Sequence, residues 1–211
     1  MNFAQDYTAK TIRNMKENYI FGSHNTMSYL PVANPLMWLP NIIVARCQSK
    51  SFKEQLDKGI RACDIRVSIC NGRMRFAHGL VDYKPDSNIS VTELLDTILT
   101  KMNSRGGYVR LILDRYKDEH DCRRFACMCE RLERRFADVH FFGGNRKRDW
   151  QSLYTFKGAI SDGDVHQHVS SMVADARWYE RICPYLYARR TSRELLKDVQ
   201  LESGINLFDF V

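Results

Sequence analysis

The chain has 211 residues, of which 44% are hydrophobic and 27% charged, a composition typical of a folded globular protein that excludes a disordered chain. Its length suits one well-buried core, so we expect a single domain over residues 1–211. Lys and Arg number 32 against 25 Asp and Glu, and the resulting net charge of +7 favours an anionic partner unless it serves only solubility.

The N-terminal residues and the cysteines indicate the compartment. Residues 1–16 carry several charges and no apolar stretch, so no secretory signal is expected there. No apolar run reaches the roughly 18 residues that a membrane-spanning helix needs. The seven cysteines are an odd number, which favours reduced thiols, and those of residues 118–136 are expected to be buried rather than to bind a metal. We therefore expect a cytoplasmic protein, with peripheral contact to a membrane as an addition.

Short apolar runs alternate along the chain with amphipathic segments, an order typical of α/β folds. Capping boxes, in which a hydroxyl and a glutamate three residues later satisfy backbone N–H groups, mark three helix starts: Ser51 with Glu54, Ser90 with Glu93, and Thr191 with Glu194. The spacing of apolar residues predicts a longer helix over 118–136. Strands are expected at residues 19–23, 62–68, 74–78, 108–114, 139–142, 158–161, 186–189 and 206–211.

Polar side chains lie at or near the C-terminal ends of most of these strands. They are His24, His78, Asp114, Asp162 and Asp209. In a barrel of parallel strands these ends form one face, and active sites are built on that face. The repetition of the pattern indicates a site there more strongly than any single residue does.

Two histidines and an arginine have the side chains that cleavage of a phosphodiester needs. His24 stands in a Gly-Ser-His-Asn-Thr turn, Asp64 and Arg66 in an Asp-Ile-Arg strand, and His78 before a glycine. One imidazole can take a proton, the second can return one, and the guanidinium can hold the phosphoryl oxygens. Taken alone, His24 would more often be structural, and Asp64 with Arg66, which share one face of a strand, could be an internal salt bridge.

These motifs, in this order, resemble the X domain of phosphatidylinositol-specific phospholipase C, particularly that of the small bacterial enzymes. The resemblance implies a TIM-like (β/α) barrel that is small and distorted or incomplete. It also implies intramolecular cleavage of a phospholipid-like phosphodiester, in which a neighbouring hydroxyl attacks phosphorus and a cyclic phosphate forms. His24 would be the general base and His78 the general acid. Arg66 would bind the phosphate, with Asp64 orienting it.

The resemblance extends to the C-terminus and to the substrate contacts. Asp209 lies between two phenylalanines, where a carboxylate needs a partner, and the resemblance implies that it hydrogen-bonds to His24. Asp162 could contact the head group of the substrate or belong to a plain Asx turn. The full set of expected substrate contacts is Asn25, Asp114, Arg115 and Asp162.

Arg66 bears on whether the protein uses a metal. In the family that the chain resembles, metal-independent bacterial enzymes have arginine at this position and calcium-dependent eukaryotic enzymes have an acidic ligand. We therefore expect no cofactor, since a guanidinium replaces the charge of the metal. Calcium is the alternative, with Asn25, Asp64 and Asp114 as its oxygen ligands.

Large apolar side chains gather soon after His24, in residues 34–40. We expect them to cap the core, or alternatively to form an exposed rim at a lipid surface with Trp38 at the headgroup level. The expected partner is an anionic phospholipid or another phosphodiester, and a nucleic acid is not expected. Two other functions are open: a glycerophosphodiester phosphodiesterase-like hydrolase, which Arg66 disfavours, and a non-catalytic barrel that binds anionic lipid.

Overall fold

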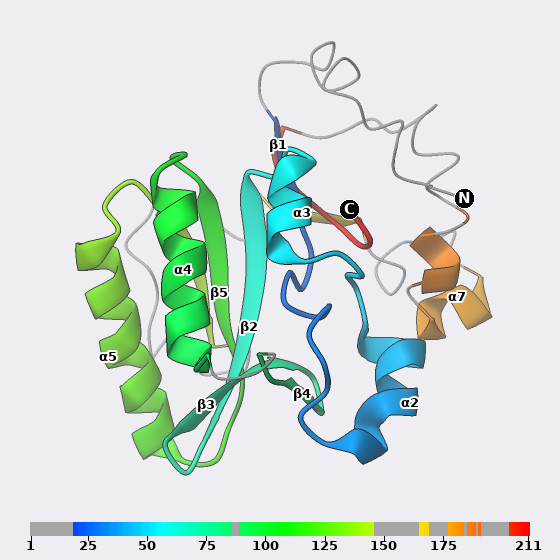
Figure 1. Cartoon of the computed structure of the whole chain (residues 1–211), viewed down its shortest axis with the longest axis horizontal. Coiled ribbons are helices and arrows are strands. Elements are labelled where there is room, and N and C mark those ends of the chain that lie inside the picture. Colours follow the sequence, from blue (N-terminus) through cyan, green and yellow to red (C-terminus); the bar gives the residue numbers. More distant parts are fainter. Residues whose placement is uncertain are drawn as a thin grey trace.

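A curled sheet forms the centre of the computed structural model, which describes residues 19–85, 89–145, 165–168, 177–183, 185–188, 190 and 203–211 (Figure 1). The strands of this sheet are β1 (Tyr19–Ser23), β2 (Ala62–Cys70), β3 (Arg73–His78), β4 (Val81–Tyr83), β5 (Tyr108–Tyr116), β6 (His140–Asn145), β7 (Val165–His168) and β8 (Gly204–Phe208). The strands expected at 19–23, 62–68, 74–78, 108–114, 139–142 and 206–211 correspond to β1, β2, β3, β5, β6 and β8, whereas β4 and β7 were not expected.

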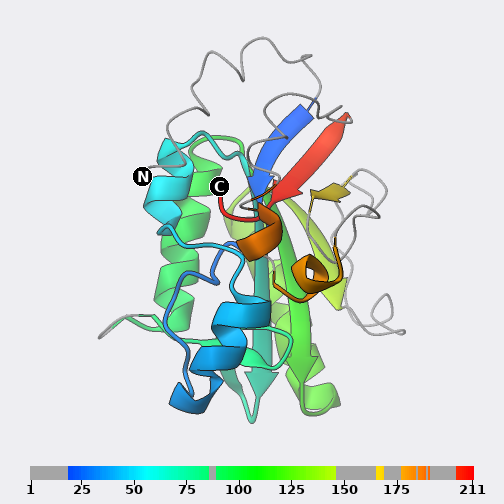
Figure 2. The same ribbon diagram turned by 90° about the vertical axis from the view of Figure 1, so that its right-hand side faces the viewer.

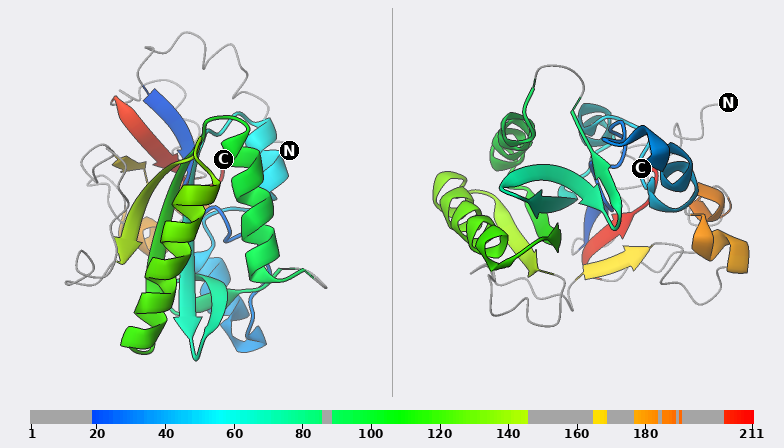
Figure 3. Two further views of the ribbon diagram at one scale, coloured as in Figure 1. Left: turned by 90° about the vertical axis from the view of Figure 1, so that its left-hand side faces the viewer. Right: turned by 90° about the horizontal axis from the view of Figure 1, so that it is seen from below.

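Six strands run parallel in the order β7-β8-β1-β2-β5-β6. Seen end-on, they curl into part of a barrel (Figure 3), and β6 and β7 do not pair within the described part of the chain. The second half of β2 pairs antiparallel with β3, which in turn pairs with β4. The fold is therefore a distorted, incomplete TIM-like (β/α) barrel, as expected from the sequence.

Helices cover the outer face of the sheet and bury the main core against it. They are α3 (Phe52–Asp57), α4 (Val91–Asn103) and α5 (Glu119–Arg135), and α4 and α5 lie side by side on one face (Figures 1 and 3). In α5, Cys122, Phe125 and Cys129 are buried, at the spacing of one helical face. Cys127 is exposed, so the expectation that all cysteines of this helix are buried is wrong for that residue. Within the described ranges, no helix has the length and apolarity to cross a membrane.

The predicted helix starts agree with the structure where it describes them. The capping boxes of Ser51 with Glu54 and of Ser90 with Glu93 are both present, and Asp118 caps α5 through the N–H of Asp121. The third box, the strand expected at 158–161 and Asp162 lie outside the described residues. The strand expected at 186–189 is wrong, because residues 185–188 are helical. Short apolar runs fit a strand or a buried helical turn equally well.

A further group of short helices follows β1. It comprises η1 (Pro35–Met37), α2 (Trp38–Pro40) and η2 (Asn41–Ala45), and Figure 2 shows this group beside α7 (Trp178–Ile182).

Gly22, near the end of β1, lies in close contact with the two neighbouring strands, β2 and β8. A Cβ on Gly22 would lie 2.7 Å from the Cβ of Ala62 and 2.8 Å from Cδ2 of Leu207. Glycine at this position lets β1 lie between β2 and β8, and so fixes the place of the turn that carries His24.

Candidate active site

The strand ends place the predicted site residues together. His24 follows β1 and Asp209 follows β8, and these two strands are parallel neighbours in register. Asp64 and Arg66 project from β2, which also pairs with β1, and both are fully buried. His78 ends β3, and its ring lies edge-on to that of His24, with the two centroids 5.8 Å apart. Five residues from four strands or strand ends thus form one cluster.

His24 makes a hydrogen bond at each ring nitrogen. Nδ1 lies 2.7 Å from Oδ1 of Asp209, so the hydrogen bond expected between these residues is present. Nη2 of Arg66 lies 2.7 Å from Nε2, and a guanidinium can only donate. Nε2 is therefore unprotonated, and neutral His24 carries its proton on Nδ1 and donates it to Asp209. This tautomer presents a lone pair on Nε2, as a general base requires.

The backbone around His24 is held by Gln48, a buried residue that the sequence did not reveal as part of the site. Its Nε2 donates to the carbonyl of His24 at 2.8 Å and to that of Phe208 at 2.9 Å. Its Oε1 accepts from the N–H of Val211 at 3.2 Å. One amide thus ties the turn after β1 to the C-terminal segment that carries Asp209, and it keeps the two partners of the dyad in register.

Asp64 is a buried carboxylate with two arginines next to it. Its Oδ2 accepts from Nε and Nη2 of Arg66 at 3.1 and 3.0 Å and from the N–H of Asn25 at 3.1 Å, and Arg110 lies 3.8 Å from Oδ1. Burial alone would raise the pKa of Asp64, but the two guanidinium groups outweigh burial and hold this pKa below its usual range. The internal salt bridge considered from the sequence therefore exists, and it also aims Arg66 at His24.

Arg110 and Asn25 add polar atoms to this cluster. Arg110, on β5, stands beside Asp64 in the parallel register; its only sequence signal is an arginine inside an apolar run. Asn25 has a positive φ of 42°, a conformation that asparagine tolerates better than most residues. Its side-chain oxygen and nitrogen are both buried without a hydrogen-bond partner. Such an amide, on the residue that follows His24, is suited to bind a ligand.

His78 has an environment that disfavours its charged form. Nδ1 lies 2.7 Å from the carbonyl oxygen of Ala45, so it carries a proton and donates it there. Burial, followed by the positive charge of Arg66 and the proximity of His24, lowers the pKa of His78 to about 4. An anion bound between Arg66 and the two rings would offset these effects and favour protonated His78.

This pKa predicts how stability depends on pH. Because the pKa of His78 is about 4 in the folded protein and roughly 6.5 in the unfolded chain, the unfolded chain binds the extra proton between these values. Stability is therefore lost as the pH falls from 6.5 towards 4, by an amount on the order of 3 kcal/mol. Urea unfolding at several pH values should show a flatter profile for His78→Asn than for the unchanged protein. Equal losses in both proteins would contradict the assignment.

Asp114 and Arg115 lie around the turn after His78, and neither contacts His24. A β-bulge between β2 and β5 leaves Asp114 out of the register, and its Oδ2 accepts from the N–H of Gly79 at 2.5 Å. Arg115 donates to the carbonyl of Gly79 at 3.1 Å and forms an ion pair with Asp82. These contacts brace the turn that presents His78.

The apolar segment after His24 is exposed rather than part of the core. Leu36 is 84% exposed and Trp38 61%, so the expectation that this segment caps the core is wrong and the exposed rim is observed. Helix α7 lies beside this segment (Figure 2), and its residue Trp178 is 75% exposed. We call this surface the apolar rim; its exposed members are Leu36, Trp38, Leu39, Ile42, Ile43, Val44, Trp178 and Ile182. Contiguous exposed apolar groups are typical of a surface that binds a membrane or a protein.

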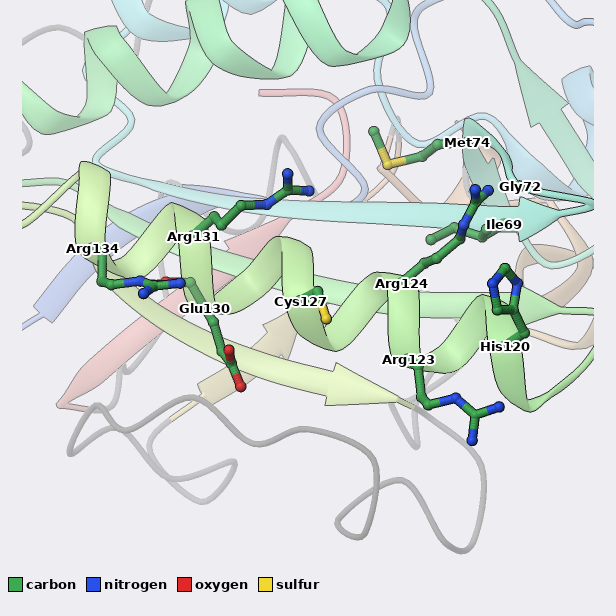
Figure 4. A pocket seen from close by; sticks show the side chains of 10 residues that line it. All are labelled: Ile69, Gly72, Met74, His120, Arg123, Arg124, Cys127, Glu130, Arg131 and Arg134. Carbon is green, nitrogen blue, oxygen red and sulfur yellow. The ribbon is translucent and has the colours of Figure 1, made fainter.

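A separate hollow of about 700 Å³ lies between α5 and the turn that joins β2 to β3 (Figure 4). Its lining includes four arginines but neither His24 nor His78: Ile69, Gly72, Met74, His120, Arg123, Arg124, Cys127, Glu130, Arg131 and Arg134. Part of the excess positive charge of the chain therefore gathers away from the histidine cluster. The hollow lacks the paired histidines and the buried carboxylate, so the histidine cluster is the better candidate for catalysis.

The fold and the site together define a class: a small, incomplete (β/α) barrel with two facing histidines at its strand ends. Solved structures of phosphatidylinositol-specific phospholipase C are similar to this chain. For a pentafluoro-Phe-containing enzyme from Staphylococcus aureus, the TM-score is 0.55 at 13% identity, with 100% of this chain and 93% of that chain covered. A second structure, solved for modulation of the membrane binding of the S. aureus enzyme, has a TM-score of 0.53 at 13% identity, with the same coverage.

The enzyme from Listeria monocytogenes has a TM-score of 0.49 at 14% identity, with 95% of this chain and 93% of that chain covered. No family model matches the sequence, and no curated protein matches it. The likeness to the two S. aureus structures, at 13% identity, shows a shared fold. A shared fold does not by itself fix a function, which depends on the residues of the site.

Proposed function

We propose that this protein is a phosphodiesterase of the phosphatidylinositol-specific phospholipase C type, cleaving a phospholipid-like phosphodiester by attack of a hydroxyl on the substrate's own head group. The observation that carries the proposal is the pair of hydrogen bonds on His24, with Asp209 at Nδ1 and Arg66 at Nε2, facing the ring of His78. This pattern supplies a base with a fixed tautomer, a cation for the phosphate and a second imidazole.

The first step of the proposed reaction requires Arg66 to change partners. In the structure its Nη2 donates to the lone pair of His24. A bound phosphate accepts that N–H instead and frees Nε2 to take the proton of the attacking hydroxyl. Asp209 then stabilises the imidazolium through Nδ1, as in other Asp–His dyads. Holding the hydroxyl next to phosphorus makes the attack effectively unimolecular.

The second part of the reaction belongs to His78. The phosphate brings negative charge close to Arg66, which is one of the groups that lower the pKa of His78. Substrate binding thereby raises this pKa and lets His78 hold the proton that the leaving alkoxide needs. The products are a cyclic phosphate and a diacylglycerol-like alcohol. We infer that the unpartnered amide of Asn25 contacts the substrate.

The buried guanidinium groups favour a reaction without a metal. Arg66 and Arg110 already surround Asp64, and a divalent cation near Asp64 would face their repulsion. We therefore expect that a chelator leaves activity on phosphatidylinositol vesicles unchanged. Release of phosphorylated head group is measured with EDTA and with added calcium. Strong dependence on calcium would instead assign Asn25, Asp64 and Asp114 as ligands. No cleavage of any phospholipid or glycerophosphodiester, with or without calcium, would overturn the proposed function.

The apolar rim supports transient binding to a lipid surface. Trp38→Ala should weaken binding to vesicles that contain phosphatidylinositol by about tenfold, because less apolar area enters the interface. Co-sedimentation with vesicles measures the binding. Turnover of a water-soluble phosphodiester serves as the control and should not change. Unaltered vesicle binding by Trp38→Ala combined with Trp178→Ala would show that the rim does not contact lipid.

A further inference from the structure

The proposed reaction makes no use of one nucleophilic group beside the histidines, the thiol of Cys47. This residue follows η2 and is 1% exposed, and its Sγ lies 3.9 Å from Nδ1 of His78. Its backbone is held on both sides: its N–H donates to Oγ of Ser28 at 3.0 Å, and its carbonyl accepts from Phe210 at 2.7 Å. The thiol is therefore fixed within the site rather than carried by a loose loop.

The thiol completes a set of possible metal ligands. One donor atom each from His24, Cys47 and Asp209 lie within 4.8 Å of one another. A second and independent observation concerns the carboxylate. While Oδ1 of Asp209 contacts His24, its Oδ2 is buried and has no hydrogen-bond partner. A buried carboxylate oxygen in this state is suited to accept a cation.

The donor types decide which cation fits. Calcium and magnesium prefer oxygen ligands only, whereas zinc accepts sulfur, nitrogen and oxygen together. Bond lengths of about 2.0 Å to nitrogen and 2.3 Å to sulfur place the ligands of one zinc ion roughly 3 to 4 Å apart. The donor atoms, which lie within 4.8 Å of one another, would thus have to shift by only about 1 Å, with Nδ1 of His24 and Oδ1 of Asp209 moving slightly apart from their present 2.7 Å, and water can take the fourth position.

We propose that His24, Cys47 and Asp209 form an inhibitory site for Zn²⁺ or a similar thiophilic cation. The cation binds Sγ, a carboxylate oxygen of Asp209 and Nδ1 of His24, which is the ring nitrogen that does not contact Arg66, and the two anionic ligands offset the repulsion from that guanidinium. The thiol proton is released to solvent, and the proton of Nδ1 moves to Nε2 through solvent. No atom changes oxidation state. Protonated Nε2 cannot accept a proton from a substrate hydroxyl, and it can no longer accept the hydrogen bond from Arg66. The inhibition rests on the proposed function, whereas the binding does not.

Binding is tested first, without any substrate. The thiolate ligand gives Cd²⁺ a charge-transfer absorption in the ultraviolet, and calorimetry with Zn²⁺ gives the affinity. Cys47→Ser should lose the Cd²⁺ absorption and bind Zn²⁺ at least tenfold more weakly. The matched control is Cys127→Ser, which removes an exposed thiol on α5 and should behave as the unchanged protein. Circular dichroism checks that each variant is folded, and Cys47→Ala replaces Cys47→Ser if the hydroxyl disturbs the buried position.

Inhibition is tested second, on phosphatidylinositol vesicles with Zn²⁺. Micromolar Zn²⁺ should inhibit the unchanged protein and Cys127→Ser, and the concentration for half inhibition should rise at least tenfold for Cys47→Ser. Equal Zn²⁺ affinity of Cys47→Ser and the unchanged protein would overturn the site. Binding that depends on Cys47 but leaves turnover unaffected would overturn the inhibition alone. If no phospholipid is cleaved at all, the proposed function fails, while the binding experiment still decides whether the site exists.

Discussion

Replacement of His24 by alanine should reduce cleavage of phosphatidylinositol by about 10⁴-fold, the upper end of the range typical for the loss of a general base. The change removes the acceptor for the hydroxyl proton, and proton transfer of this kind is typically worth 10² to 10⁴ in rate. It also leaves Asp209 without the partner that lies 2.7 Å away. His78→Ala should cost about 10² to 10⁴, because the leaving alkoxide must then take its proton from water.

These losses are measured as initial rates of head-group release, after circular dichroism and urea unfolding have confirmed that each variant is folded. His140→Ala is the matched control, since His140 lies on β6 and stacks on Tyr108, away from the site. A substrate with a better leaving group than an alkoxide should recover much of the activity of His78→Ala and little of that of His24→Ala. Near-normal turnover by either variant on the best lipid substrate would show that the acid–base pair is misassigned.

Replacement of Asp209 by asparagine should lower the rate by several orders of magnitude at most, with little change in fold. An amide can offer its NH₂ group to Nδ1, and His24 then carries its proton on Nε2, where it cannot act as a base. An Asp-to-Asn change in another Asp–His dyad cost about 10⁴-fold in kcat by the same mechanism. The substrate KM should change little, because Asp209 contacts His24 and not the phosphate.

The control for this prediction is Asp121→Asn. Asp121 is also a buried aspartate that accepts hydrogen bonds, from the N–H groups of Gly72 and Lys117, but it does not contact His24. The ¹⁵N chemical shifts of His24 report its tautomer directly. The protonated nitrogen should be Nδ1 in the unchanged protein and Nε2 in Asp209→Asn. Full activity of Asp209→Asn, or an unchanged tautomer, would exclude the dyad as the source of the base.

The sequence predicted for a physical reason that Asp209 needs a partner, because a carboxylate between two phenylalanines is unfavourable when it is unpaired. The resemblance to the phospholipase C family, and not the chain itself, pointed to His24 as that partner. Likewise, Asp64 and Arg66 share a face because side chains two apart on a strand point the same way. These relations depend on local periodicity and on the cost of a buried charge, both of which can be inferred from the chain alone.

Other parts of the site depend on packing between distant segments and could not be predicted in this way. Gln48 belongs to no sequence motif. It holds the site only because the segment after η2 packs against the C-terminus, where Gln48 hydrogen-bonds to the backbone of His24 and Val211. Cys47 enters the site for the same reason. The bulge at Asp114 depends on how β2 twists against β5, which moves that carboxylate to the turn of Gly79. The sequence could not decide whether Trp38 is exposed or buried, because a cluster of apolar residues fits a core and a lipid-facing rim equally well.

In the proposed reaction, the substrate's own hydroxyl attacks phosphorus with His24 as the base. Phosphorus NMR of phosphatidylinositol vesicles during turnover can follow this step. A cyclic phosphodiester should appear first, and none should form with His24→Ala. A substrate analogue lacking the neighbouring hydroxyl should not be cleaved. A phosphomonoester as the first product, or cleavage of that analogue at a comparable rate, would contradict the proposed reaction.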